Sequence, residues 1–238
     1  MMMDDSALRE RYRSVLERLG EAVARAGRTS EEVRLIAVSK LHPAADVACV
    51  AAAGQVDFGE NYVQEALQKR QELVDQPQCR DIRWHMIGHV QSRKAAQVAG
   101  AFALVHTLDS VKLEKRAAAL DVVQPVLCEI NVGEEPQKAG IMADALPGLA
   151  EHVLAHCPHL ELQGLMCLPP VFDAGEAARP YFARLYRLRE DLRARTGLPL
   201  PHLSMGMSGD FAAAVAEGAT LVRIGTDIFG PRPPKVTA

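Results

Sequence analysis

Two consecutive predicted strands near the C-terminus, each ending in a glycine-containing turn, constrain the fold more than any other part of the sequence. Within the segment 202–230, residues 203–206 have the pattern of a short strand, and Ser208 is a suitable N-cap for the helix that follows. Residues 220–224 form the second, apolar strand, which leads into the turn at 225–226. The loops after strands seven and eight of a (β/α)8 barrel commonly bind phosphate through backbone N–H groups. This segment therefore predicts a barrel with a phosphate site at its last two strand ends.

The rest of the chain alternates strand and helix patterns, as a parallel α/β fold requires. The predicted strands cover residues 33–39, 56–58, 82–87, 103–106, 125–132, 160–168, 203–206 and 220–224. Helical patterns follow at about 43–54, 62–74, 91–98, 109–120, 143–156, 181–195 and 208–218. This alternation favours a single closed (β/α)8 TIM barrel, with a doubly wound open sheet as the alternative.

An additional amphipathic helix is predicted within residues 1–28, before the first strand. Leu8, Val15 and Leu19 recur there at helical spacing, between charged residues. The residues after Gly225 are too few for a full eighth crossover helix. The N-terminal helix is therefore expected to pack on the barrel and fill the gap in its outer ring.

The composition indicates a single domain without a membrane or nucleic-acid partner. Hydrophobic residues make up 48% and charged residues 24% of the chain, and no low-complexity run or Gly/Ser linker interrupts residues 1–238. The formal net charge of −3 argues against a sequence-independent hold on nucleic acid. No run has the length of a membrane span, the N-terminus lacks the apolar region of a signal peptide, and the five cysteines include no CxxC pair. We therefore expect a cytoplasmic protein with reduced thiols. A monomer is our separate expectation for its oligomeric state.

Lys40 stands out among the residues that follow the predicted strands, because the strand before it is otherwise apolar. Desolvation at the end of a buried strand penalises the charged amine and lowers its pKa, which frees the lone pair for attack on a carbonyl. A lysine that merely extends to solvent is the alternative for an isolated strand-end lysine. Together with the phosphate-binding turns, Lys40 is typical of a Schiff base with pyridoxal 5′-phosphate (PLP), or of a Schiff-base aldolase that acts on a sugar phosphate.

Arg223 favours the first of these two chemistries. It lies two residues before Gly225 on the same strand, so alternation puts both positions on one face. A guanidinium is permanently charged and can only donate hydrogen bonds. Beside a pyridine nitrogen it would keep that nitrogen unprotonated, which makes the ring a weaker electron sink than an aspartate partner would. An arginine held in a surface ion pair is the alternative.

Seven short blocks, spread over nearly the whole chain, occur in the order that one known family shows. They are SK at 39–40, FGENYVQE at 58–65, WHMIGHVQSRK at 84–94, NVGEEPQKAG at 131–140, GLMCLPP at 164–170, LSMGMSGD at 203–210 and VRIGTDIFG at 222–230. On these blocks the chain resembles the pyridoxal phosphate homeostasis protein family, which older descriptions call the proline synthase co-transcribed homologue family. Arg93 departs from the pattern, because the family usually has asparagine at that position. This departure leaves the role of that helix start open and does not affect the expected cofactor site.

The resemblance implies a PLP-bearing barrel similar to the N-terminal domain of bacterial alanine racemase. Lys40 matches the Schiff-base lysine, and Arg223 matches the arginine at the pyridine nitrogen. Ser208, with the backbone of the turn that follows Arg223, matches the phosphate site. The complete set that the resemblance assigns to the cofactor is Lys40, Asn61, Ser208, Arg223, Gly225 and Thr226.

The family is described as binding, buffering and delivering PLP, with effects on amino-acid and keto-acid balance. The resemblance therefore implies a role in vitamin B6 homeostasis, with PLP-requiring apoenzymes as partners. The alternative is a PLP-dependent amino-acid racemase of weak activity. Racemisation needs an acid or base on each face of the substrate carbon, and alanine racemase takes a tyrosine base from a β-rich domain that this sequence is not expected to form. Of the four tyrosines, only Tyr62 lies near the predicted mouth, so we expect no robust catalytic activity.

Three further patterns are weaker signals. His152 and His156 have i, i+4 spacing on a predicted helix, but no carboxylate lies in register with them, so no metal site is expected. The sequence GMSGD at 206–210 lacks the last glycine of the G-x-S-x-G elbow, which disfavours a serine hydrolase. His85 and His89 lie near the predicted mouth, where contact with a ligand and a structural hydrogen bond are both open.

Overall fold

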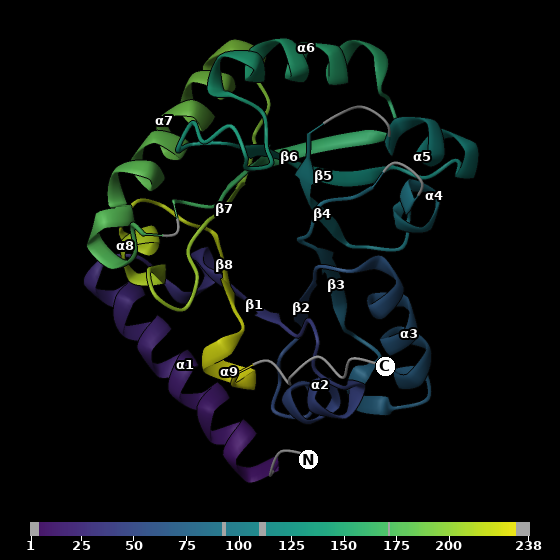
Figure 1. Ribbon diagram of the computed structural model, residues 1–238, viewed down its shortest axis with the longest axis vertical. Coiled ribbons are helices and arrows are strands. Elements are labelled where there is room, and N and C mark those ends of the chain that lie inside the picture. Colours follow the sequence, from purple (N-terminus) through teal and green to yellow (C-terminus); the bar gives the residue numbers. More distant parts are fainter. Residues whose placement is uncertain (1–4, 92–93, 110–112, 171, 232–238) are drawn as a thin grey trace.

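The structure, a computed structural model, describes residues 5–91, 94–109, 113–170 and 172–231. The described residues contain eight strands, which form a closed parallel barrel in chain order. β8 pairs with β1 and completes the ring, which Figure 1 shows surrounded by helices. The predicted (β/α)8 barrel is therefore confirmed, and the open-sheet alternative is wrong.

The strands lie close to their predicted positions, with differences at their ends. They are β1 (Arg34–Val38), β2 (Asp57–Glu60), β3 (Arg83–Met86), β4 (Leu104–Leu108), β5 (Gln124–Ile130), β6 (Leu160–Cys167), β7 (His202–Ser204) and β8 (Leu221–Ile224). β2 continues beyond the predicted residue 58 because Glu60 pairs with Met86 of β3. β7 ends earlier than predicted, since Gly206 turns the chain with a φ of 92°.

The helices show larger differences from their predicted bounds. They are α1 (Asp5–Arg25), α2 (Ala44–Ala51), α3 (Val63–Leu73), α4 (Ala95–Val98), α5 (Glu114–Leu120), α6 (Leu146–His156), α7 (Arg179–Thr196), α8 (Phe211–Ala216) and α9 (Thr226–Phe229). The helix predicted from residue 143 begins as a 3-10 turn, because Pro147 has no N–H to bond to the C=O of Ala143. Arg93 and Ser110, at the predicted starts of two helices, lie outside the described residues.

The helix after β7 starts later than the sequence pattern predicted. Its N-cap is Asp210 and not Ser208. Oδ1 of Asp210 accepts a hydrogen bond from the N–H of Met207 at 2.6 Å, and the N–H of Phe211 donates to the C=O of Met207 at 2.9 Å. These two bonds close a turn over residues 207–210. Ser208 therefore lies within the turn and leaves the capping position to Asp210.

The N-terminal helix α1 lies on the outside of the barrel beside α2, α8 and α9 (Figure 1). Its apolar face buries Leu8, Val15 and Leu19, as the spacing predicted. Arg18 adds an ion pair to Asp227 of α9, with 2.6 Å between Nη2 and Oδ2. Because α9 is short, α1 covers the position that an eighth crossover helix takes in a regular barrel.

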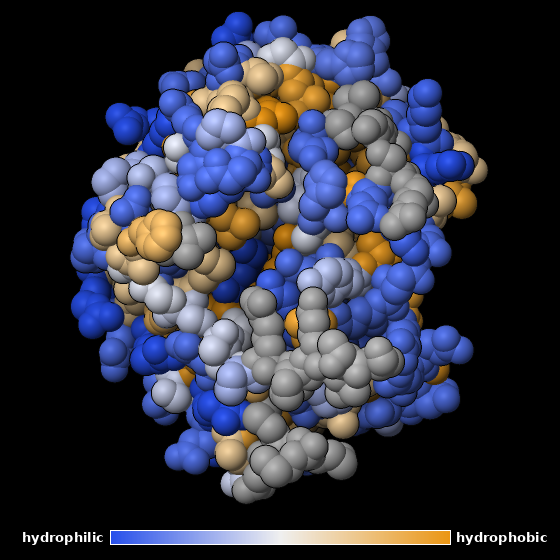
Figure 2. Space-filling view, viewed as in Figure 1, coloured by the Kyte–Doolittle hydropathy of each residue, from blue (hydrophilic) through white to orange (hydrophobic). Residues whose placement is uncertain are grey.

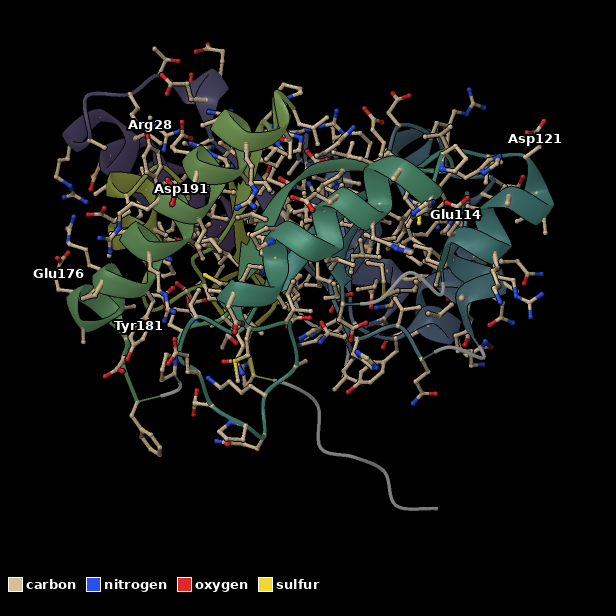
Figure 3. All side chains as sticks on the ribbon, turned by 90° about the horizontal axis from the view of Figure 1, so that it is seen from above. Arg28, Glu114, Asp121, Glu176, Tyr181 and Asp191 are labelled. Carbon is tan, nitrogen blue, oxygen red and sulfur yellow. The ribbon has the colours of Figure 1, made fainter. Side chains whose placement is uncertain are left out.

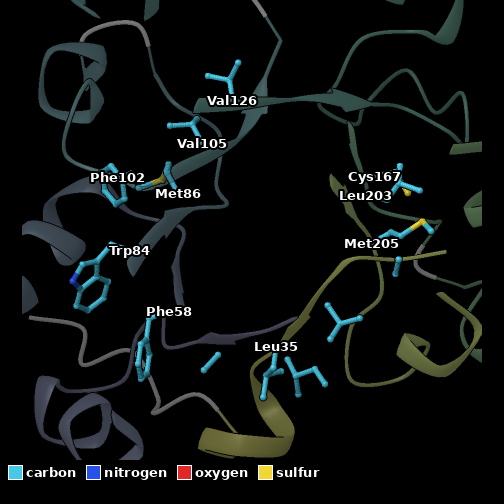
Figure 4. Close-up of a cluster of buried hydrophobic side chains, with 14 of the residues drawn as sticks. Leu35, Phe58, Trp84, Met86, Phe102, Val105, Val126, Cys167, Leu203 and Met205 are labelled. Atoms are coloured by element: carbon cyan, nitrogen blue, oxygen red, sulfur yellow. The ribbon is translucent and has the colours of Figure 1, made fainter. Parts of the chain in front are cut away.

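Two apolar clusters hold the barrel together. The larger one lies between the strands and the surrounding helices and includes Phe58, Trp84 and Phe102 (Figure 4). The smaller one consists of Ile36, Leu104, Leu127, Met166 and Leu221. Buried polar side chains on the strands accompany the smaller cluster: Asp57, His85, His106, Ser204 and Arg223. The inside of the barrel is therefore partly polar, and its polar part reaches the predicted site at Arg223.

Candidate functional site

A cavity of about 480 Å³ opens at the end of the barrel where the strands finish. Figure 2 faces this end of the molecule and shows a hollow near its centre. The cavity is lined by all the residues that the family resemblance assigned to a cofactor: Lys40, Asn61, Ser208, Arg223, Gly225 and Thr226. They belong to β8 and to the segments after β1, β2, β7 and β8, which closure of the barrel brings together. Their convergence is a feature of the fold, and their binding of a cofactor is still a prediction.

A larger depression, of about 590 Å³, lies beside Arg28. Figure 3 shows both Arg28 and Tyr181 on the left of the molecule, with Arg28 near the top of the view and Tyr181 below it. The hydroxyl of Tyr181 donates to Asp173 in the wall of the mouth cavity. Nη1 of Arg28 donates to the C=O groups of Val215 and Ala219, at 3.0 and 2.7 Å. This arginine therefore tethers α8 and the start of β8. The smaller cavity at the mouth is the one that combines an amine, a guanidinium and open backbone donors.

Lys40 occupies a turn directly after β1 that buried charged residues hold in place. The hydroxyl of Ser39 donates to Oε1 of Glu60 at 2.7 Å. Nζ of Lys69 donates to the same oxygen at 2.6 Å and to the C=O of Ser39 at 2.7 Å. Both Glu60 and Lys69 are buried, so this pair forms a rigid base under the turn.

Glu65 holds the other side of the turn. Its Oε1 accepts hydrogen bonds from Nζ of Lys69 at 2.7 Å and from the N–H of Leu41 at 2.5 Å. Leu41 has a φ of 65°, a left-handed conformation that costs on the order of 1 kcal/mol for a residue with a side chain. Glu60, Glu65 and Lys69, which we call the Lys69 cluster, therefore stabilise a strained turn and set the position of Lys40. The sequence pattern did not point to Lys69, although its i, i+4 spacing from Glu65 is a recognisable signal.

The turns after β7 and β8 give the cavity its backbone donors. In the described part of the chain, the N–H groups of Ser208 and Gly209 form no hydrogen bond. A Cβ placed on Gly209 would meet only Ala174, at 4.0 Å, so the space beside this turn is open. A Cβ on Gly225 would lie 3.0 Å from the C=O of Val38, which leaves little room for a larger residue. The end of β8 therefore packs closely on the end of β1, next to the lysine turn.

Asn61 enters the cavity wall from the segment after β2. Its side-chain Oδ1 is buried and has no hydrogen-bond partner among the described residues. The backbone of Asn61 packs on Gly88, where a Cβ would lie 2.3 Å from the C=O of Asn61. Glycine is therefore required at position 88, two residues after β3, to admit Asn61 to this position. A buried acceptor without a partner indicates a donor on a bound molecule or on water.

Arg223 is buried in the wall of the cavity, with 4% of its surface exposed. Its Nη1 donates to Oγ of Ser204 at 2.5 Å, and its Nη2 donates to the C=O of Cys167 at 2.9 Å. Burial lowers the pKa of the guanidinium from its ordinary value, but arginine stays charged at neutral pH. The cavity therefore carries a fixed positive charge whose orientation is set by two neighbours.

His85 lies inside the barrel and does not line the cavity. Its Nε2 is 2.9 Å from Oδ1 of Asp57, and its Nδ1 is 3.0 Å from Nε2 of His106. The structural hydrogen bond is therefore the observed one of the two possibilities for His85. His89 is more than half exposed and pairs with Asp109, with 3.2 Å between Nδ1 and Oδ2. Neither histidine contacts the cavity, and His106 was not singled out from the sequence.

Asp57 should make the stability of the protein depend on pH in a defined window. Burial raises the pKa of its carboxyl, but hydrogen bonds from His85 and Arg83 outweigh burial and lower the pKa from 3.8 to about 2. Because the folded state binds this proton less readily than the unfolded state, the stabilisation is complete above about pH 4 and is lost as the pH falls toward 2. We expect the free energy of unfolding, measured by urea titration, to fall more steeply over this window for the wild type than for Asp57→Asn.

Asp46→Asn is the matched control for this measurement. Asp46 is also buried and also lies near a histidine, His42, but burial raises the pKa of its carboxyl. Its removal should leave the loss of stability below pH 4 in place. Equal slopes for the wild type and Asp57→Asn would contradict the low pKa of Asp57.

A second lysine reaches the cavity from the loop 133–140. Lys138 lines the cavity, donates to the C=O of Pro169 at 3.0 Å, and pairs with Glu135 at 2.5 Å. The side chain of Asn131 donates to the C=O of Glu135 at 2.7 Å and ties the start of the loop. The cavity therefore contains two amines, and the sequence patterns had identified only Lys40.

Comparison with known proteins identifies the family. Residues 14–233 match the family described as alanine racemase, N-terminal domain. The chain is 42% identical over 227 residues to the pyridoxal phosphate homeostasis protein of Aquifex aeolicus, a match that covers 94% of this chain and 97% of the other. The chain belongs to the pyridoxal phosphate homeostasis protein family. The corresponding family member of Pseudomonas aeruginosa is 45% identical over 232 residues, with 95% and 96% covered.

Solved structures of this family and of alanine racemase share the fold. PipY of Synechococcus elongatus, whose structure was determined with PLP bound, is 36% identical and has a TM-score of 0.77 over 89% of this chain and 100% of PipY. Alanine racemase of Corynebacterium glutamicum has a TM-score of 0.72 over 99% of this chain and 64% of its own length, at 18% identity. The latter likeness shows the fold alone. Within the residues described for this homeostasis-family member, no helix combines the length and the apolar character needed to cross a membrane.

Proposed function

We propose that this member of the pyridoxal phosphate homeostasis protein family binds PLP in the mouth cavity, stores it in the cytoplasm and delivers it to PLP-requiring apoenzymes. The observation that carries the proposal is the convergence of Lys40, Arg223 and the turn at Ser208 on one cavity. The names of the relatives and the PLP bound to PipY support the same cofactor. A monomer suffices for this role, because every proposed ligand of PLP comes from one chain.

The residues of the cavity fit the parts of PLP. When bound, PLP supplies an aldehyde that condenses reversibly with a primary amine, and Lys40 offers that amine. The hydroxyl of Ser208, the open N–H groups at 208 and 209 and the backbone of the turn after β8 would hold the phosphate. Arg223 would donate to the ring nitrogen and keep it unprotonated. The unpartnered Oδ1 of Asn61 would accept a hydrogen bond from a polar group of the cofactor or from water beside it.

The charges around the cavity also suit an anionic ligand. Lys40, Lys138 and Arg223 line the wall together with Asp173 and Asp210. Burial raises the pKa of the Asp210 carboxyl, an effect that the N–H of Met207 and the charge of Arg223 oppose. The excess of positive groups favours a phosphate ester over a neutral amino acid or sugar. A sugar phosphate carries the same anionic ester, so an experiment has to separate the aldolase alternative from PLP binding.

The side chains that line the cavity favour storage and delivery of PLP over rapid catalysis. Racemisation needs an acid or base on each face of the substrate carbon, and alanine racemase uses a tyrosine for one of them. None of the four tyrosines, all of which lie in the described part of the chain, lines the cavity. Lys40 would therefore act without a tyrosine partner. A weak racemase activity is the remaining enzymatic alternative.

The test is to add PLP to the purified protein and to record the visible absorption spectrum before and after borohydride reduction. We expect a visible band that reduction removes, with about one cofactor per chain retained in the mass spectrum. The loaded protein should restore activity to the apoenzyme of a PLP-dependent enzyme. Racemisation and transamination of alanine should stay well below about 1 per second.

Each rival function has its own contradicting result. If the protein stays colourless with PLP, but borohydride traps a covalent adduct between its lysine and a sugar phosphate, the aldolase function is favoured. If the protein forms D-alanine at about 1 per second or faster, its role is catalysis of racemisation and not storage of PLP. If the PLP-loaded protein never activates an apoenzyme, the proposed delivery is wrong, and only the proposed storage of PLP is retained.

A further inference from the structure

A continuous series of hydrogen-bonding side chains crosses the inside of the barrel and ends at Arg223. It starts at Asp57 on β2 and passes through His85 on β3 and His106 on β4, with distances of 2.9 and 3.0 Å. Nδ1 of His106 is 2.8 Å from Oγ of Ser204 on β7, which accepts the hydrogen bond from Arg223 on β8. We call these five residues the interior chain. All of them are buried, so solvent does not supply substitute partners.

The chemistry of its two ends allows only one direction of donation along the interior chain. Arginine has no acceptor, so Nη1 of Arg223 donates to Oγ of Ser204. An ionised carboxylate has no donor, so Nε2 of His85 must donate to Asp57. A neutral imidazole has one N–H, which leaves Nδ1 of His85 as an acceptor. His106 therefore donates from Nε2, and its Nδ1 accepts the hydroxyl proton of Ser204.

The surroundings keep the histidines neutral and the carboxylate charged at neutral pH. Hydrogen bonds from Arg83 and His85 outweigh burial and hold the pKa of Asp57 at about 2. Burial lowers the pKa of His85, an effect opposed by Asp57 and supported by the nearby charges of Arg34 and Arg83. Burial likewise takes the pKa of His106 well below its ordinary value. The reverse direction would need a lone pair of His85 to face the carboxylate, which is repulsive.

We propose that Asp57 is a positioning residue that sets the tautomers of His85 and His106 and thereby presents Oγ of Ser204 as an acceptor to Arg223. The hydroxyl of Ser204 donates its one proton to His106, so both lone pairs of its oxygen are available to accept from the guanidinium of Arg223. The C=O of Cys167 holds the second nitrogen of Arg223 at 2.9 Å. A carboxylate four hydrogen bonds away thus determines how the guanidinium is held in the cavity wall.

The consequence for the cofactor rests on the proposed function. If PLP lies in the cavity, the orientation of Arg223 decides how well it donates to the ring nitrogen. Loss of one hydrogen bond to a charged group changes an equilibrium by on the order of tenfold. Removal of the hydroxyl of Ser204 should therefore weaken PLP binding by about that factor and shift the visible band, while Lys40 still provides the covalent attachment.

The primary test is ¹⁵N NMR of the histidine side chains in the cofactor-free protein at neutral pH. His85 and His106 should both be neutral, with the proton on Nε2 and none on Nδ1. His85→Gln and His106→Gln identify the two sets of signals among the eight histidines. A proton on Nδ1 of either residue in the wild type would overturn the proposal, whether or not the protein binds PLP.

Asp57→Asn tests the role of the carboxylate. Asparagine can donate from its amide as well as accept, so the reverse direction becomes available and protonated Nδ1 should appear at His85 and His106. Asp46→Asn alters a buried aspartate of α2 that lies beside His42. This variant should leave the ¹⁵N signals of His85 and His106 unchanged. Unchanged tautomers in Asp57→Asn would overturn the assignment to Asp57.

The cofactor arm compares Ser204→Ala with Ser204→Thr, which keeps the hydroxyl. About tenfold weaker PLP binding and a shifted band in Ser204→Ala, with recovery in Ser204→Thr, would support the positioning of Arg223. Binding by Ser204→Ala equal to the wild type would overturn it. A wild type that binds no PLP would instead defeat the proposed function, and the tautomers would still decide the direction of the interior chain.

Discussion

Lys40→Ala is expected to abolish covalent attachment of PLP, from about one borohydride-trapped cofactor per chain in the wild type to none. The reason is that the proposed bond requires a primary amine at the end of β1, where the turn over residues 39–41 places it. The phosphate donors at 208 and 209 and the guanidinium of Arg223 are untouched. The variant should therefore still bind PLP, more weakly and without the band that reduction removes. Absorption spectroscopy and mass spectrometry after reduction measure both effects.

Lys138→Ala is the matched control, because Lys138 is the other described lysine in the cavity wall. Its ammonium is engaged by Glu135 and by the C=O of Pro169, so it is not expected to be the attachment point. This variant should keep the reducible band and one trapped cofactor. Trapping that persists in Lys40→Ala and disappears in Lys138→Ala would reverse the assignment of the two amines.

The fold, and the meeting of the candidate cofactor residues at one cavity, could be predicted from the sequence because parallel barrels have simple rules. Apolar runs such as those of β1 and β8 indicate buried strands, and the segments that follow parallel strands share one mouth. This rule alone places Lys40 near the turn at residues 225–226, although they are far apart along the chain. The family blocks added the identity of the expected ligand.

The supporting residues could not be predicted because their roles depend on tertiary neighbours. Lys69 looks like an ordinary helical lysine until the packing of α3 on β2 buries it against Glu60. His106 looks like the end of a strand, and only barrel closure brings it to Ser204 from a distant part of the chain. Ser208 has the right residue type for an N-cap, but the hydrogen bond from Met207 to Asp210 moves the helix start. In each case the role of the residue is set by a hydrogen bond that its residue type and sequence spacing do not reveal.

The structure supports the two ends of the proposed site in different ways. The lysine turn is held by charges, since the Lys69 cluster binds the backbone on both sides of Lys40. The guanidinium of Arg223 is held by a series of mostly neutral groups that ends at a carboxylate. The first arrangement costs desolvation and breaks sharply when one member is lost. The second should respond gradually, because each neutral hydrogen bond contributes only about 1 kcal/mol.

Lys69→Met is therefore expected to cause the largest loss of stability, about 3–5 kcal/mol in the free energy of unfolding at neutral pH. The substitution leaves the carboxylate of Glu60 fully buried, with Oε2 already lacking a partner among the described residues. Burial raises the pKa of Glu60 from its ordinary value, and Lys69 opposes this rise. Without Lys69, the folded state should hold a proton that the unfolded state releases above about pH 4.5. Stability should therefore be lost as the pH rises from 4.5 through the raised pKa of Glu60.

Urea titrations between pH 4.5 and 8 measure this loss. Lys115→Met is the control, because Lys115 is exposed on α5 and its substitution should change stability by no more than about 0.5 kcal/mol. The double variant Glu60→Gln/Lys69→Met removes the stranded charge, so it should recover much of the stability and lose the dependence on pH. A Lys69→Met protein as stable as the Lys115→Met control would show that Glu60 and Lys69 are not a buried ion pair. The support inferred for the turn at Lys40 would then have to come from Glu65 alone.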